Sequence, residues 1–130
     1  QTYMNHPVAC AAALANIEIL KRERLIDNAR VMGDYFLDGL KLLTCYEAVG
    51  EVRGIGLWAV LDLTTDRSTR ALFPADRLER MVQRAKEKGL IIKFMHCALE
   101  FAPSLVVTRG DIDLALRIID ECLAEDVRAH

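Results

Sequence analysis

Two residues of this chain, Thr2 and Lys93, have surroundings that suggest a binding role. Thr2 offers a hydroxyl and a backbone N–H shortly before an Ala- and Leu-rich stretch that predicts a helix over residues 8–20. The unpaired N–H groups and the dipole at a helix start favour an anion, so a phosphate there is physically reasonable. The competing interpretation is that Thr2, Asn5 and His6 only cap the helix, and the residues alone favour capping.

Lys93 follows the apolar run "GLII" in a stretch that predicts a strand. A cation at such a place must either reach solvent or meet a carboxylate. Reaching solvent is the favoured interpretation from the residues alone. Glu100, between Leu99 and Phe101 in the next predicted strand, is also unusual, and a sheet face open to solvent would account for it.

Histidine and cysteine side chains form two further pairs. His6 and Cys10 are four residues apart on one helix face, but two ligands do not make a zinc site, and a capping histidine beside a buried thiol explains them more simply. His96 and Cys97 are adjacent, and neighbouring strand side chains point to opposite faces, which argues against a Cys-His nucleophile. No GxSxG, HExxH, Walker or GxGxxG motif occurs. The sequence therefore predicts no metal site and no catalytic residue in this chain.

Composition narrows the class of protein. The 130 residues are 52% hydrophobic and 28% charged, as in a folded globular domain, and the net charge of -2 gives no electrostatic case for nucleic acid or an anionic membrane. No apolar run reaches the roughly eighteen residues of a membrane span. The four cysteines are scattered without a CxxC pair, which predicts reduced, mostly buried thiols and a cytoplasmic location.

Hydrophobic periodicity predicts the elements that must position these residues. We expect a second helix after a bend at residues 21–24, a helix after Pro74 that ends before Gly89, and a last helix opened by a capping box of Thr108 and Asp111. Residues 125–130 are expected to fray. Residues 57–63 predict a strand covered on both faces, and two short strands joined by "MHC" predict a hairpin.

The order of these elements predicts the fold class. It is α/β, an α+β layer sandwich in which helices pack on a small, mostly antiparallel sheet of three to four strands. No repeat, low-complexity segment or linker divides the chain, so residues 1–130 are expected to form one domain.

Three stretches together carry a family resemblance. "TYMNHPVACAAALANIEIL", "VGEVRGIGLWAVLDL" and "GLIIKFMHCALEFAPSLVVTRGDID" resemble, in order and spacing, the C-terminal part of class III aminotransferases. These are pyridoxal-phosphate enzymes of fold type I that include the ω-amino acid:pyruvate transaminases. The resemblance runs from Thr2 to about Leu123, and it implies an enzyme that transfers an amino group from an amine or ω-amino acid to a 2-oxo acid such as pyruvate.

The resemblance also implies roles for individual residues. Thr2 would bind the phosphate of pyridoxal 5'-phosphate held by the neighbouring subunit of a homodimer, and Tyr3 would add a backbone contact. This implication favours the anion-site interpretation of Thr2 over capping. Lys93 stands where the family often has an arginine that binds the substrate carboxylate, and its ammonium is a point charge that cannot form the same two-pronged contact.

The resemblance finally implies a missing part. The lysine that attaches the cofactor would belong to a larger domain upstream, so this chain would be the C-terminal small domain, inactive alone, with its helix over residues 1–20 at the junction. Separated from that domain, the helix should expose an apolar surface and self-associate. The alternative is a non-catalytic α+β module for ligand binding or dimerisation.

Overall fold

The computed structural model describes residues 6–129 of the chain. Its elements, in chain order, are α1 (Pro7–Arg22), α2 (Leu25–Leu42), the 3-10 turn η1 (Leu43–Cys45), β1 (Val49–Ile55), β2 (Trp58–Asp66), β3 (Ala71–Leu72), α3 (Ala75–Glu87), β4 (Lys93–Met95), β5 (Ala98–Phe101) and α4 (Arg109–Ala129). The predicted α/β layer architecture is confirmed, with four α-helices and a small antiparallel sheet.

The sheet has five strands rather than the three to four expected. The main path is β1-β2-β5-β4, with every neighbouring pair antiparallel, and the two-residue β3 pairs with β2. Strand β1 was not predicted, because Gly50 and Gly54 lower its strand propensity. The structure explains Gly54, since a Cβ there would lie 2.4 Å from the carbonyl oxygen of Trp58 on the paired strand.

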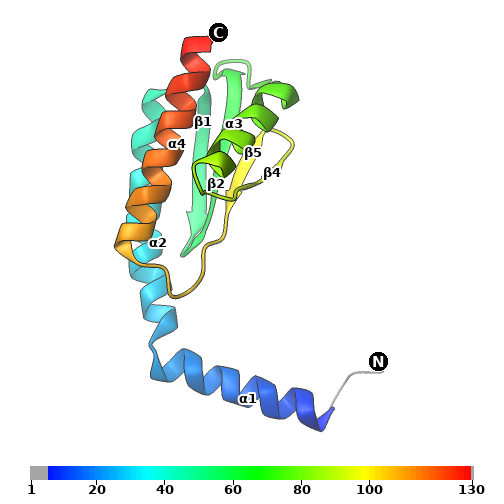
Figure 1. Cartoon of the computed structure of the whole chain (residues 1–130), viewed down its shortest axis with the longest axis vertical. Helices are drawn as coiled ribbons and strands as arrows, with labels where there is room; N and C mark the ends of the chain where they lie inside the picture. Colours follow the sequence, from blue (N-terminus) through cyan, green and yellow to red (C-terminus); the bar gives the residue numbers. More distant parts are fainter. Residues whose placement is uncertain (1–5, 130) are drawn as a thin grey trace.

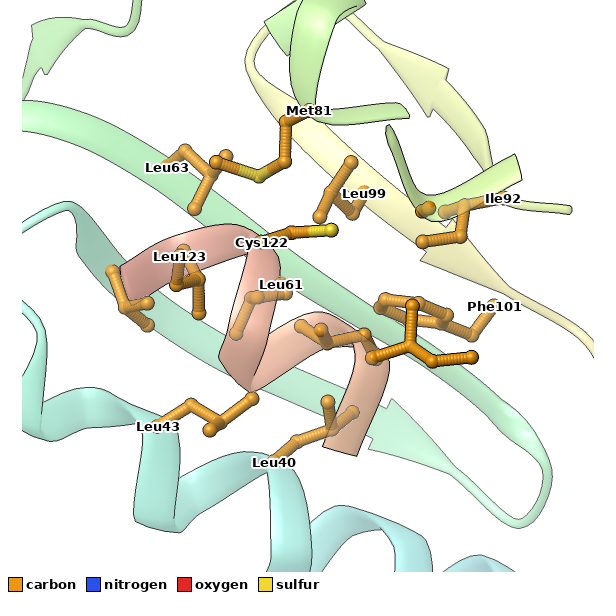
Figure 2. Packing of buried hydrophobic residues seen from close by; sticks show 14 of the residues in the cluster. Leu40, Leu43, Leu61, Leu63, Met81, Ile92, Leu99, Phe101, Cys122 and Leu123 are labelled. Carbon is orange, nitrogen blue, oxygen red and sulfur yellow. The ribbon is translucent and has the colours of Figure 1, made fainter. Parts of the chain in front are cut away.

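Helices α2, α3 and α4 share one core with the inner face of the sheet. Figure 2 shows Leu61, Leu63, Leu99 and Phe101 of the sheet meeting side chains of these helices, including Leu40, Met81 and Leu123. Within residues 6–129 the outer face carries exposed side chains, including Ile55, Trp58 and Met95. The expectation that residues 57–63 are covered on both faces is therefore wrong for this chain, because all three helices pack on the same side.

Helix α2 approaches the sheet at a glycine contact. A Cβ on Gly33 would lie 2.2 Å from the carbonyl carbon of Gly56, which belongs to the turn between β1 and β2 and has a φ of +53°. Glycine at both positions lets the two backbones touch and lets the turn adopt its left-handed conformation. The glycines of the "RGIG" stretch thus serve packing and turning.

Helix α1 is separated by a sharp break from the body of the structure, which consists of the sheet and helices α2, α3 and α4. Arg24, in the left-handed conformation with φ 52°, separates α1 from α2, which confirms the bend expected at residues 21–24. No residue of α1 is buried, and Figure 1 shows it running away from the sheet and the other helices. Pro7 occupies the first turn of α1, and the His6 side chain makes no capping hydrogen bond, so the capping predicted for His6 is wrong. Thr2 and Asn5, the other predicted caps, lie outside the described residues.

The other helix ends test the remaining expectations. Gly89 follows α3 with a φ of +95°, and Thr108 and Asp111 exchange hydrogen bonds as a capping box, so both predictions are confirmed. The expected fraying of residues 125–130 is wrong as far as Ala129. Helix α4 continues to that residue because buried Asp126 accepts a hydrogen bond from Arg77 Nε of α3 at 3.2 Å.

The four cysteines are all free thiols, but only Cys122 is buried. Cys10 is exposed on α1, none of whose residues is buried, and Cys45 is exposed in η1. The expectation of mostly buried thiols is therefore wrong. Among the helices of residues 6–129, none combines the length and apolar character that a membrane crossing requires.

Candidate functional site

The predicted site residues fall in two places. Thr2 and Tyr3 lie outside the described residues, so their proposed contacts with a phosphate stay predictions. Lys93 opens β4, an edge strand of the sheet. The site that the structure describes is therefore built around Lys93.

Lys93 both reaches solvent and meets a carboxylate. Its side chain is 69% exposed, and its Nζ lies 3.2 Å from Glu100 Oε2. The two residues stand directly opposite each other in the β4–β5 ladder, which places their side chains on one face of the sheet. The two interpretations left open from the sequence are thus both part of the observed arrangement.

Glu100 is held more firmly than the lysine that it pairs with. Its side chain is only 21% exposed, and the indole Nε1 of Trp58 donates a hydrogen bond to its Oε1 at 3.0 Å. The Trp58 hydrogen bond, and after it the contact with Lys93, lower the pKa of Glu100 below its ordinary value. The carboxylate is therefore ionised at neutral pH and anchors the ammonium.

Trp58 is a member of this cluster that the sequence analysis missed. Glu100 pairs with Val60 of β2, so Trp58, two residues earlier, projects from the same outer face of the sheet. Trp58 is 58% exposed, although its indole N–H donates to Glu100. An aromatic residue two positions from the partner of an acidic strand residue is the signal that would have found it, but that signal requires the strand register.

Arg53 and Asp62 form a second ion pair on the same face. Arg53 Nε and its terminal nitrogen donate to the two carboxylate oxygens of Asp62 at 3.3 and 3.1 Å across the β1–β2 ladder. These two residues line a hollow of about 340 Å³ that also includes Trp58 and Glu100. The outer face therefore carries two neutralised pairs rather than a field of one sign.

A larger hollow of about 470 Å³ opens beside Lys93 and Glu100. Its other walls are mostly apolar and come from α2, the end of β5, the segment after it and the start of α4, with Phe36, Phe101 and Ile112 among the lining residues. Such a hollow suits an apolar body with one charged end that meets the ion pair.

The lysines of the described residues are not buried. The five lysines are Lys21, Lys41, Lys86, Lys88 and Lys93, and each lies at the surface. No group of three or more His, Cys, Asp or Glu side chains within residues 6–129 is placed to hold a metal. The arrangement can bind and orient a charged small molecule, and its lysine, Lys93, lines the larger hollow with its ammonium paired to Glu100.

The chain matches one family over nearly its whole length. The family model described as "Aminotransferase class-III" covers residues 1–123. A taurine–pyruvate aminotransferase of Bilophila wadsworthia is 39% identical over 119 residues, which are 85% of this chain and 26% of that protein. The chain thus spans about a quarter of the length of the curated relatives that it matches.

Solved structures agree with the sequence match. A thermostable (S)-enantioselective omega-transaminase from Thermomicrobium roseum superposes with a TM-score of 0.85 at 31% identity, over 98% of this chain and 30% of that one. The omega transaminase of Pseudomonas jessenii in complex with PMP gives a TM-score of 0.87 at 33% identity, over 95% of this chain and 28% of that one. The observed fold is therefore shared with these transaminases.

Proposed function

The chain belongs to the class III aminotransferases, and from that premise we propose that residues 1–130 are the C-terminal small domain of a transaminase. The proposed reaction moves an amino group from an amine or ω-amino acid to a 2-oxo acid such as pyruvate. The family match over residues 1–123 carries this proposal. The surface position of every lysine supports a second point, that the lysine holding the cofactor lies elsewhere and that this chain alone is inactive.

Pyridoxal 5'-phosphate, when bound, supplies the electron sink for the transfer of the amino group. The proposed contribution of this chain is to hold the phosphate of a cofactor in the neighbouring subunit through Thr2, with a backbone contact from Tyr3. Both residues precede α1, whose N-terminal N–H groups favour an anion. The exposed apolar side chains of α1 suit packing against the large domain or the homodimer partner. We place the enzyme in the cytoplasm.

Lys93 is the proposed recognition residue for the substrate carboxylate. Its ammonium is mostly exposed and can reach a bound small molecule, but it already neutralises Glu100 at 3.2 Å. A substrate carboxylate must therefore compete with Glu100 or share the ammonium with it. This competition predicts weaker recognition than a free arginine would provide.

One observation favours the alternative of a non-catalytic dimerisation module. Helix α1 exposes four large apolar side chains, those of Val8, Leu14, Ile17 and Ile19. A second copy of the chain is one partner that could cover such a surface. In that case no amino transfer would be found in any assembly that contains the chain.

The complete protein that carries this sequence distinguishes the two proposals. We expect it to retain pyridoxal phosphate and to form alanine from pyruvate with at least one amine in a donor screen, run in parallel with 2-oxoglutarate. Thr2→Ala should weaken cofactor retention, and Lys93→Ala should raise the KM for carboxylate-bearing substrates. Lys41→Ala removes an exposed lysine paired with Asp38 on α2 and serves as the control. Absence of any transfer would support the module.

A further inference from the structure

The segment between β5 and α4, residues 102–108, forms part of the wall of the larger hollow. Ala102, Pro103 and Val107 line that hollow together with Lys93 and Glu100. The segment is irregular, with an internal turn in which the Val107 N–H donates to the Ser104 carbonyl at 3.0 Å. Its position relative to Lys93 therefore depends on what holds its backbone.

Asn28 of α2 holds this segment from the side. Its Nδ2 donates one hydrogen bond to the Leu105 carbonyl at 2.8 Å and another to the Val107 carbonyl at 3.1 Å. Both protons of one amide nitrogen are thus used on two carbonyls of the same turn, across 77 and 79 residues of sequence. Asn28 is half-buried and does not itself line the hollow.

Asn28 also stands at the base of α1. It lies in the first turn of α2, and its own N–H donates to the carbonyl of Arg24, the residue at the break between the two helices, at 3.1 Å. In Figure 1 the segment before α4 passes beside this first part of α2. One residue therefore links the point where α1 departs to the wall of the hollow next to Lys93.

We propose that Asn28 is a positioning residue: its side-chain amide fixes residues 102–108 and so sets the wall of the hollow that faces Lys93. The effect on substrates rests on the proposed function, whereas the effect on the segment does not. No aspartate can do the same task at this position, because a carboxylate has no proton to donate and would face two carbonyl oxygens.

The test compares Asn28→Asp with Gln83→Glu in the complete enzyme. Gln83 is exposed on α3 and donates to Glu87, so the control makes the same change from amide to carboxylate without breaking a contact to the segment. Asn28→Ala removes both hydrogen bonds without adding charge, and it replaces Asn28→Asp if that variant does not fold.

Two measurements keep the outcomes apart. Hydrogen exchange should show the Val107 amide exchanging about tenfold faster in either Asn28 variant, and steady-state kinetics should show KM for carboxylate-bearing substrates raised about fivefold with kcat nearly unchanged. Gln83→Glu should match the wild type in both. If the exchange of the Val107 amide is unchanged, Asn28 does not fix residues 102–108. If the amide exchanges faster but kcat and stability fall equally and KM does not change, Asn28 has no positioning role toward the substrate. If the wild-type enzyme transfers no amino group, the proposed function fails. The exchange measurement still shows whether Asn28 fixes residues 102–108.

Discussion

Helices α1 and α2 follow each other along the chain, yet they bury their apolar side chains to opposite extents. Leu14 of α1 is 64% exposed, whereas Leu40 of α2 is 0% exposed. Both helices are rich in apolar and helix-forming residues. The difference is that α2 packs on the sheet and on α4, while α1 packs on α2 and has no buried residue.

This difference separates two sources of helix stability. The helix α1 depends on local propensity, on Pro7 in its first turn and on Lys21 and Arg22 at its end, where cations suit the dipole. The helix α2 gains in addition from burial of Phe36 and Leu40 in the core. Within residues 6–129, α1 leaves apolar side chains exposed, as expected for the proposed junction with a larger domain.

The strongest test of the comparison makes one substitution in each helix. Leu40→Ala should lower the free energy of unfolding of the chain by about 4 kcal/mol, because it removes buried methyl groups and leaves a cavity. Leu14→Ala should change it by less than about 0.5 kcal/mol, since the side chain is already in water and alanine is an excellent helix former. Urea unfolding followed by circular dichroism measures both. Equal losses would show that α1 packs on the body in solution.

A smaller contrast compares one ion pair in each region. Asp126→Asn breaks the pair between α4 and Arg77 of α3, whose side chains are 3% and 18% exposed, and it should cost about 3 kcal/mol. Glu23→Gln breaks the pair with Arg22 at the end of α1, where the side chains are 45% and 70% exposed, and it should cost less than about 0.5 kcal/mol. Thermal unfolding of both variants checks the contrast. If Asp126→Asn lowers the free energy of unfolding by less than about 1 kcal/mol, the pair with Arg77 does not stabilise the end of α4.

The smallest expected effect is a loss of folding stability at alkaline pH, and it involves Tyr46 and Asp120, which lie outside α1. The hydrogen bond from the Tyr46 hydroxyl to Asp120 of α4 raises the pKa of Tyr46 from 10.0 to about 12. Because the folded state keeps this proton longer, the stabilisation is present below pH 10 and is lost as the pH rises from 10 to about 12. Tyr46→Phe should cost under about 1 kcal/mol at neutral pH and make unfolding less dependent on pH in that window.

An absorbance titration of the phenolate provides the control. Asp120→Asn removes the charged acceptor and should move the Tyr46 titration back toward its ordinary pKa. If that variant titrates as the wild type does, the Asp120 hydrogen bond does not hold the proton.

Much of the fold follows from local signals in the sequence. The break at residues 21–24, the stop at Gly89, the capping box of Thr108 and Asp111 and the β4–β5 hairpin were all predicted, because each depends on residues close together in the chain. Strand β1 was missed because its glycines weaken the strand pattern. Glycine is needed at position 54 because a Cβ there would collide with Trp58 and Leu37, which are not its neighbours in the sequence. The end of α4 was misjudged because Arg77 lies 49 residues away.

The candidate site also has some features that local sequence indicated and others that depend on tertiary contacts. The sequence by itself indicated the family and, through it, Thr2, Tyr3 and Lys93, because those residues stand within the short stretches that carry the resemblance. Only the tertiary structure decided that Lys93 meets Glu100, that Trp58 holds this carboxylate and that Asn28 reaches residues 105 and 107. The physical reason is that helix ends, turns and strand patterns depend on near neighbours, whereas these contacts join residues that only register and packing bring together.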